Sequence, residues 1–230
     1  MNNITPDTTI NNAQTNTVTI SGVVIAKPKF AHNANNHTFY RFDLSIKRLS
    51  GTTDIIPVII DKKLLRLTEN DENQIDAGTY LKIHGQFRSY SKHNMITGKH
   101  TLILNVLAKN MTIISENECK YENKIRLTGY LCKKPNYRTT PLGKSINDML
   151  IAVNRTYGKN SDYIPTICWG NTAIRNENTP IGTKLKLTGR IQSREYVKTN
   201  PETNEVTTHT AYEVSAAHII SAEKDEHACV

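Results

Sequence analysis

The sequence predicts an all-β protein made of two consecutive copies of one small barrel. Three observations lead to this: short apolar–polar alternations recur along the chain, a short helix is predicted between two of the strands, and the second half repeats the first. Alternation with a period of two is typical of strands that bury one face. A chain of 230 residues is long enough for two domains of ordinary size.

The first copy begins after a polar, Asn/Thr-rich segment. Its first strand contains Val18 and Ile20 and continues beyond Gly22, a residue that often marks a bulge or bend within a strand. Further strands are predicted at 42–46, 55–60, 81–87 and 101–107, the last continuing at 111–114. Leucines among charges at 62–74 predict a short helix between the third and fourth strands. This order is typical of an OB-fold, a five-stranded Greek-key barrel.

The second copy follows the first at a nearly constant offset. At an offset of 107 the matched pairs are Asn16 with Asn123, Gly22 with Gly129, Pro28 with Pro135 and Phe30 with Tyr137. One inserted residue later, DIIP at 54–57 matches DYIP at 162–165. A period near 100 residues indicates a duplicated domain. The expected organisation is a flexible arm (1–15), an N-terminal OB-fold (16–115), a linker (116–122), a C-terminal OB-fold (123–220) and a short tail (221–230).

Composition narrows the class of protein. The net charge of +8 favours an acidic partner such as nucleic acid, and it is spread over both halves. The four cysteines have no CxxC spacing, so we expect neither a zinc site nor another metal or cofactor. The polar N-terminus is not a signal peptide and no apolar run reaches 18 residues, so a cytoplasmic protein without a membrane span is expected. The chain lacks HExxH, GxSxG and P-loop motifs, which argues against an enzyme.

One stretch, NRTYGKNSDYIPTICWG at 154–170, holds the only tryptophan. Tyr163 and Trp169 share one parity and therefore one face of the predicted strand. Such rings either pack in the core or, beside cations, form a surface that stacks bases. The first copy has Ile55 and Asp61 at the matching positions. Because the barrel pattern persists there without rings, we favour a binding role for the two aromatics.

The second copy also resembles the bacterial single-stranded DNA-binding protein family. The resemblance covers 123–220 and rests on an ordered set of segments: NKIRLTG, RTTPLGK, IAVNR, DYIPTICWG and GRIQSREY. It implies an OB-fold that coats single strands without catalysis, in assemblies of four such folds. Two folds per chain then imply a homodimer.

The resemblance also implies site residues. The positions of the family's stacking aromatics are here Tyr157, Tyr163, Trp169 and Tyr196, and the nearby candidates for phosphate contacts are Arg138, Lys144, Arg155, Arg190 and Arg194. The first copy has none of these aromatics. There we expect either charge alone, from Lys27, Lys47, Arg48, Arg88, Lys92 and Lys99, or a separate aromatic set of Phe30, Tyr40 and Tyr90.

The predicted function is sequence-independent binding and protection of single-stranded DNA in replication, recombination or repair. The alternative is a scaffold of a primosome or phage complex with weak DNA affinity. The family's acidic tail with a hydrophobic tip is reduced here to SAEKDEHACV, so recruitment of protein partners through the tail is expected to be weak or absent.

Overall fold

The computed structural model describes residues 15–66, 75–93, 95, 98, 100–156, 160–199 and 205–221. Apart from Thr15 and Ser221, the predicted arm and tail lie outside the described residues, as do Lys99 and Tyr157. Over the described part of the chain, no helix is long and apolar enough to cross a membrane.

The first half forms a barrel from β1 to β6. Its elements are β1 (Asn16–Val24), β2 (Lys29–Ala34), β3 (His37–Lys47), β4 (Thr53–Asp61), α1 (Lys62–Arg66), β5 (Tyr80–His93) and β6 (His100–Ile113). The predicted helix at 62–74 is confirmed over Lys62–Arg66, and its remainder lies outside the described residues. A 3₁₀ turn, η1 (Glu116–Glu118), then leads into the second half.

The second half repeats this order. Its elements are β7 (Asn123–Leu131), β8 (Asn136–Thr139), β9 (Ser145–Asn154), β10 (Ser161–Trp169), α2 (Gly170–Arg175), β11 (Lys184–Thr199) and β12 (Val206–Ser221). Helices α1 and α2 occupy the same place, directly after the strand that carries the DxIP sequence.

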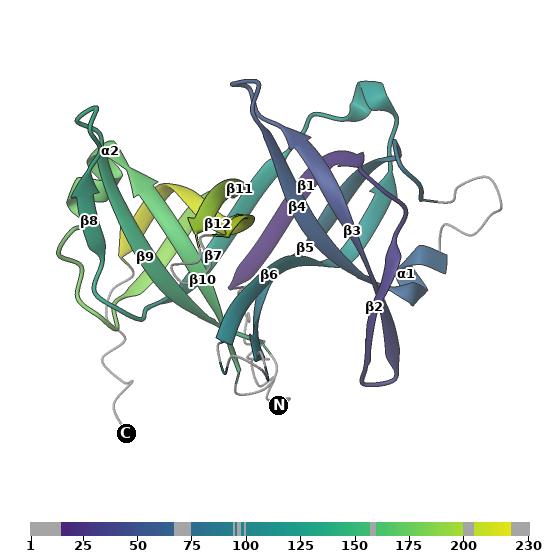
Figure 1. The fold of residues 1–230 in the computed structure, drawn as a ribbon, viewed down its shortest axis with the longest axis horizontal. Coiled ribbons are helices and arrows are strands. Elements are labelled where there is room, and N and C mark those ends of the chain that lie inside the picture. The colour runs from purple at the N-terminus through teal and green to yellow at the C-terminus, as the bar shows by residue number, and fades with distance from the viewer. Residues whose placement is uncertain are drawn as a thin grey trace, which may run out of the picture.

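All strands join one sheet in the order β2-β3-β4-β6-β5-β1-β7-β11-β12-β10-β9-β8. Additional pairings of β1 with β3 and of β7 with β9 close each half into a barrel, and β4–β6 and β10–β12 are parallel. Figure 1 shows the two barrels side by side. The predicted pair of OB-folds is confirmed, with one addition to each half. Strands β2 and β8 extend the barrels as outer partners of β3 and β9, a hairpin that the weak alternation of KFAHNA and NYRT does not reveal.

The predicted alternation places the core correctly. On β3, Phe42, Leu44 and Ile46 are buried while the residues between them face outward. On β10, Ile164 and Cys168 are buried in the same way. Burial of such side chains stabilises a fold by roughly 1.5–3 kcal/mol each.

Glycines mark the points where a strand changes partner. A Cβ on Gly22 would overlap the carbonyl oxygen of Ser45, and one on Gly129 would overlap that of Ala152. Here β1 pairs with both β5 and β3, and β7 pairs with both β11 and β9. The absence of a side chain allows the backbones to approach closely enough to close each barrel.

The barrels meet along β1 and β7, which pair antiparallel. Val18 lies opposite Ile125, and these two residues match each other in the repeat. Each strand therefore pairs with its own counterpart, which places an approximate two-fold axis at the centre of the junction. The hydrogen bond from Ser21 N–H to Glu122 O (2.8 Å) is mirrored by that from Thr128 N–H to Thr15 O (2.7 Å).

Candidate nucleic-acid interface

Strand β10 presents two aromatic side chains on its outward face. Tyr163 is 47% exposed and Trp169 is 43% exposed, whereas Ile164 and Cys168 on the opposite face are buried. The structure therefore excludes the alternative in which both rings pack in the core. Exposed rings of this size on a sheet face offer π surfaces for stacking.

Trp169 occupies the last position of β10, where the chain turns into α2. Gly170 follows with φ of +56°, a left-handed conformation that glycine adopts without strain. Trp169 itself is extended, with φ of −127° and ψ of 154°, and occupies the N-cap position of α2 without a capping hydrogen bond from its side chain. The indole therefore lies at the junction of β10 and α2.

Tyr196 lies apart from β10, on the long hairpin arm formed by β11 and β12. It is 41% exposed and stands opposite His209, with the two rings stacked at 5.6 Å between centroids. His209 is thus a ring of the arm that sequence reasoning missed. The only sequence signal was alternation in VTTHTAYEV. The segment between β11 and β12 is too long for the sequence to show that Tyr196 and His209 are cross-strand partners.

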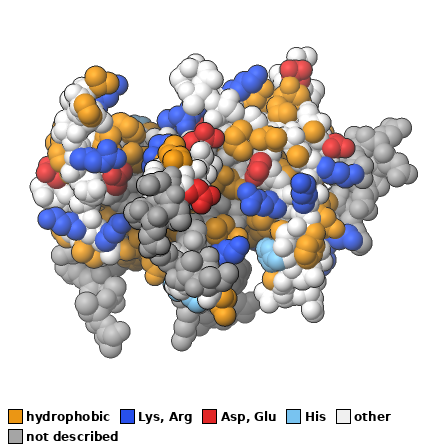
Figure 2. All heavy atoms as spheres, viewed as in Figure 1, with side chains coloured by type: hydrophobic (Ala, Val, Ile, Leu, Met, Phe, Trp, Pro, Cys, Tyr) orange, Lys and Arg blue, Asp and Glu red, His pale blue; other side chains and the backbone are white. Residues whose placement is uncertain are grey.

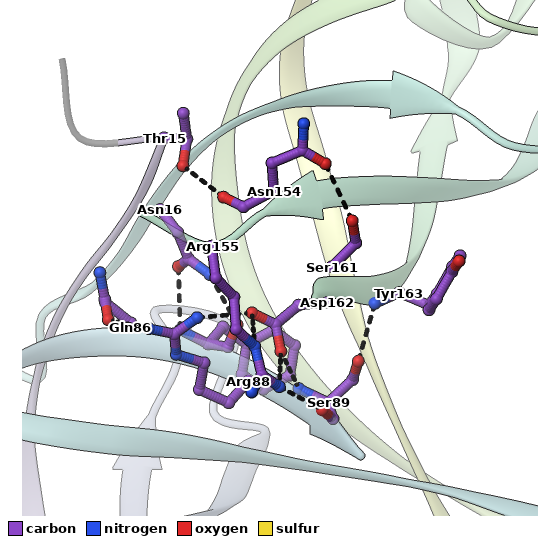
Figure 3. A network of polar contacts seen from close by, with 11 residues as sticks. Thr15, Asn16, Gln86, Arg88, Ser89, Asn154, Arg155, Ser161, Asp162 and Tyr163 are labelled. Carbon is purple, nitrogen blue, oxygen red and sulfur yellow. Dashed lines mark hydrogen bonds and ion pairs between the residues drawn. The ribbon is translucent and has the colours of Figure 1, made fainter. Parts of the chain in front are cut away.

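A buried ionic network connects β10 to the first barrel beside Tyr163 (Figure 3). The side chain of Asp162 is fully buried and accepts hydrogen bonds from Arg88 Nη1 and Arg155 Nη2, both at 2.7 Å. The backbone N–H of Ser89 donates to the same carboxylate at 2.8 Å, and Tyr163 N–H donates to Ser89 Oγ at 2.7 Å. The tyrosine ring itself points away from this network in Figure 3.

The network has a counterpart across the approximate two-fold axis. Asp54 accepts hydrogen bonds from Arg48 Nη2 at 2.5 Å and from the backbone N–H of Ser193 at 2.9 Å. Ile55 N–H donates to Ser193 Oγ at 2.9 Å, as Tyr163 does to Ser89. Each barrel therefore contacts the hairpin arm of the other barrel through hydrogen bonds to the aspartate of its DxIP sequence.

Two cations predicted to contact phosphates lie near the junction of the barrels and not on open surface. Arg155 binds Asp162 and also donates to Ser89 O at 2.9 Å. Arg190 is half-buried beside the Arg48–Asp54 pair, and burial followed by the charge of Arg48 lowers the pKa of its guanidinium. Sequence alone does not show that Arg155, just after β9, and Arg190, on β11, lie close to the neighbouring barrel.

The other predicted cations lie at the surface of the second barrel. Arg138 on β8 pairs with Asp148 at 3.0 Å in an exposed contact, and Lys144 lies in the β8–β9 turn. Arg194 on the β11–β12 arm is exposed, with Glu213 at 3.9 Å. Figure 2 shows Lys and Arg side chains on both barrels.

The described part of the chain holds neither a metal cluster nor a reactive thiol at Cys168. No group of three or more His, Cys, Asp or Glu side chains is placed to hold a metal ion there. Burial, with a further contribution from Asp148, raises the pKa of the Cys168 thiol to about 11, so this thiol is protonated and unreactive at neutral pH.

Comparison with known proteins identifies the family. The family model described as "Single-strand binding protein family" matches residues 122–219. Single-stranded DNA-binding protein B of Bacillus subtilis (strain 168) is 35% identical over 83 residues, which cover 32% of this chain and 71% of that protein. The chain belongs to the single-strand binding protein family.

One further relative and one solved structure are also similar to this chain. Single-stranded DNA-binding protein 1 of Staphylococcus aureus (strain COL) is 36% identical over 80 residues, or 32% of this chain and 48% of that protein. The chain thus spans about half the length of that relative. The wild-type single-stranded DNA-binding protein of Thermus aquaticus superposes with a TM-score of 0.70 and 16% identity, over 91% of this chain and 93% of that one. This last likeness shows that the two-barrel fold as a whole occurs in a solved structure.

Proposed function

We propose that this protein binds single-stranded DNA without sequence preference and protects it during replication, recombination or repair. The observation that carries the proposal is the pair of exposed rings, Tyr163 and Trp169, on one face of β10 in the barrel that matches the family. Base stacking on aromatics suits a sequence-blind binder because every base has a π face.

The proposed contacts divide into rings and cations. Tyr163, Trp169 and Tyr196 stack bases, and Arg138, Lys144 and Arg194 contact phosphates. Tyr157 remains a candidate from the sequence. Arg155 serves instead to join the barrels, because its guanidinium group binds Asp162 and the backbone oxygen of Ser89 in the first barrel. Arg190 is half-buried beside Arg48 and is not among the proposed phosphate contacts.

We also propose that the protein binds DNA without catalysing a reaction. The family is one of DNA-binding proteins and not of enzymes. We propose that the chain acts in the cytoplasm, where replication and repair expose single strands.

We further propose that two chains associate, so that one assembly contains four OB-folds. Each chain already joins two barrels through an approximate two-fold axis at β1 and β7, and a homodimer doubles this number by the commonest closed symmetry. Analytical ultracentrifugation is expected to give twice the mass of the 25.9 kDa chain. A stable monomer at micromolar concentration would rule out the dimer.

The test of the function uses Trp169 as its own probe, since it is the only tryptophan of the chain. Addition of oligo-dT is expected to quench its fluorescence. Contact with about six phosphates gives a slope of roughly −4 for log affinity against log salt concentration. Absence of quenching and of salt dependence would favour a protein scaffold instead, and equal affinity for duplex DNA would indicate charge attraction alone.

A further inference from the structure

A row of three aromatic rings lies on the β2–β3 hairpin of the first barrel, outside the positions that match the rings of the second. His32 and Phe39 stand opposite each other, with ring centroids 5.0 Å apart and planes at 19°. His37 lies 6.2 Å from Phe39 at 29°. His32 is exposed at the end of the row, and Figure 2 shows histidine and hydrophobic side chains together on this hairpin.

This ring row lies on the outward face of the barrel. Side chains alternate along β3, and Phe42 points into the core, so Phe39 and Arg41 point outward. Lys29 on β2 is the cross-strand partner of Arg41, and both are exposed. Cross-strand partners share a face, so two cations and three rings follow one another along the same surface.

The row also lies next to the position that corresponds to Trp169. That position is Asp61 in the first barrel, and Asp61 is the cross-strand partner of Phe39. The carboxylate of Asp61 contacts His37 Nδ1 and accepts the backbone N–H of Lys63 at 2.8 Å. Although burial opposes the effect, these partners lower the pKa of Asp61. The negative charge of Asp61 is therefore balanced by groups of the protein itself.

The β11–β12 arm of the second barrel lies close to β3 and β4 of the first. Ser193 of β11, three residues before Tyr196, hydrogen-bonds to Asp54 at the start of β4. Tyr212 of β12 is near enough to β3 that the charges of Asp43 and Arg41 act on its hydroxyl, although burial contributes most to its raised pKa. The arm that carries Tyr196 therefore lies against the barrel that carries the ring row.

We propose that His32 and Phe39 form a second stacking platform for single-stranded DNA, with Lys29 and Arg41 on the adjoining phosphates. The first barrel has thus kept a base-binding surface that is displaced by one or two strands from the position of Trp169. A single strand bound to the second barrel continues along the β11–β12 arm onto this platform. The proposal rests on the DNA-binding function proposed above and specifies the path of the longer strand.

The experiment compares two oligo-dT lengths with the intact chain. A length of about 10 nucleotides fills roughly one OB-fold, and one of about 30 extends beyond it. Phe39→Leu keeps an apolar side chain on the strand but removes the ring. It is expected to weaken binding of the longer oligonucleotide by about five-fold or more and to leave the shorter unchanged. The matched control is Phe30→Leu, which removes an exposed ring from the opposite face of the same hairpin and is expected to change neither affinity.

The outcomes separate this inference from the function on which it rests. If the unaltered chain binds the short oligonucleotide and Phe39→Leu binds the long one as tightly as the unaltered chain does, the second platform is refuted while the function stands. If the unaltered chain binds neither length, both fail. Circular dichroism melts establish that the variants fold. Should Phe39→Leu unfold, ultraviolet cross-linking of the long oligonucleotide to the unaltered chain decides: cross-links within residues 29–41 support the platform, and their absence overturns it.

Discussion

Replacing Asp162 by asparagine removes the negative charge at the centre of the contact between the barrels. The side chain of Asp162 is fully buried, and its two partners Arg88 and Arg155 are only 19% and 31% exposed. Loss of one member of a buried ion pair leaves uncompensated charge and costs about 3–5 kcal/mol. Because both guanidinium groups keep some hydration, and because asparagine can still accept from Ser89 N–H, we expect the lower end, about 3 kcal/mol.

This loss is measured by urea and thermal unfolding, followed by circular dichroism. For a chain of this size it corresponds to a fall in Tm of about 6–12 °C. The control is Asp148→Asn, which breaks the exposed pair with Arg138 and is expected to cost less than about 1 kcal/mol. If Asp162→Asn unfolds at the same urea concentration as Asp148→Asn, the network does not stabilise the junction and the reasoning is wrong.

Three further predictions concern stability and reactivity. Gly129→Ala places a Cβ against a backbone carbonyl of β9 and is expected to cost about 1–3 kcal/mol, so an unchanged Tm would contradict the close approach. Hydrogen bonds from Lys82 and then Lys124 lower the pKa of Glu122, so its stabilisation is present above the unfolded pKa of about 4.3 and disappears as the pH falls through the folded value. Glu122→Gln is therefore expected to be less stable at pH 7 but equal to the unaltered chain near pH 3. A difference in unfolding free energy that does not change with pH would refute this. Cys168 is expected to react with a thiol reagent at pH 8 only after denaturation, and rapid labelling of the folded chain would contradict its burial.

Much of the fold could be predicted because duplication supplies an internal control. The offset that pairs Gly22 with Gly129 marked both barrel closures, and the alternation around Leu44 identified the core face. Strands β2 and β8 could not be predicted, because an outer hairpin buries little apolar area and leaves no clear alternation.

The candidate site was predicted less completely than the fold. The exposure of Tyr163 and Trp169 followed from the comparison of the two copies. The position of Arg155 did not, since its partner Ser89 lies 66 residues away, and only tertiary packing brings the two together. The stack of His32 on Phe39 likewise depends on a register shift within the β2–β3 hairpin.

Matching the two copies position by position finds no platform in the first barrel. Position matching compares Asp61 with Trp169 and finds a carboxylate in place of a ring. In the folded barrel the neighbouring strand supplies Phe39 beside that position. The residues that form a binding surface come from neighbouring strands, and a comparison of single positions along the chain does not show which strands are neighbours.

One set of affinities decides whether the rings of the second barrel bind single strands. Fluorescence anisotropy of a labelled oligo-dT of about 10 nucleotides, a length within the range of one OB-fold, is measured with the unaltered chain, Trp169→Leu and Tyr90→Leu. Tyr90 is an exposed tyrosine on the corresponding arm of the first barrel. We expect Trp169→Leu to weaken binding by about 5- to 150-fold, the equivalent of roughly 1–3 kcal/mol of lost stacking, and Tyr90→Leu by less than about two-fold. Unchanged affinity of Trp169→Leu, or an equal loss in Tyr90→Leu, would contradict the claim.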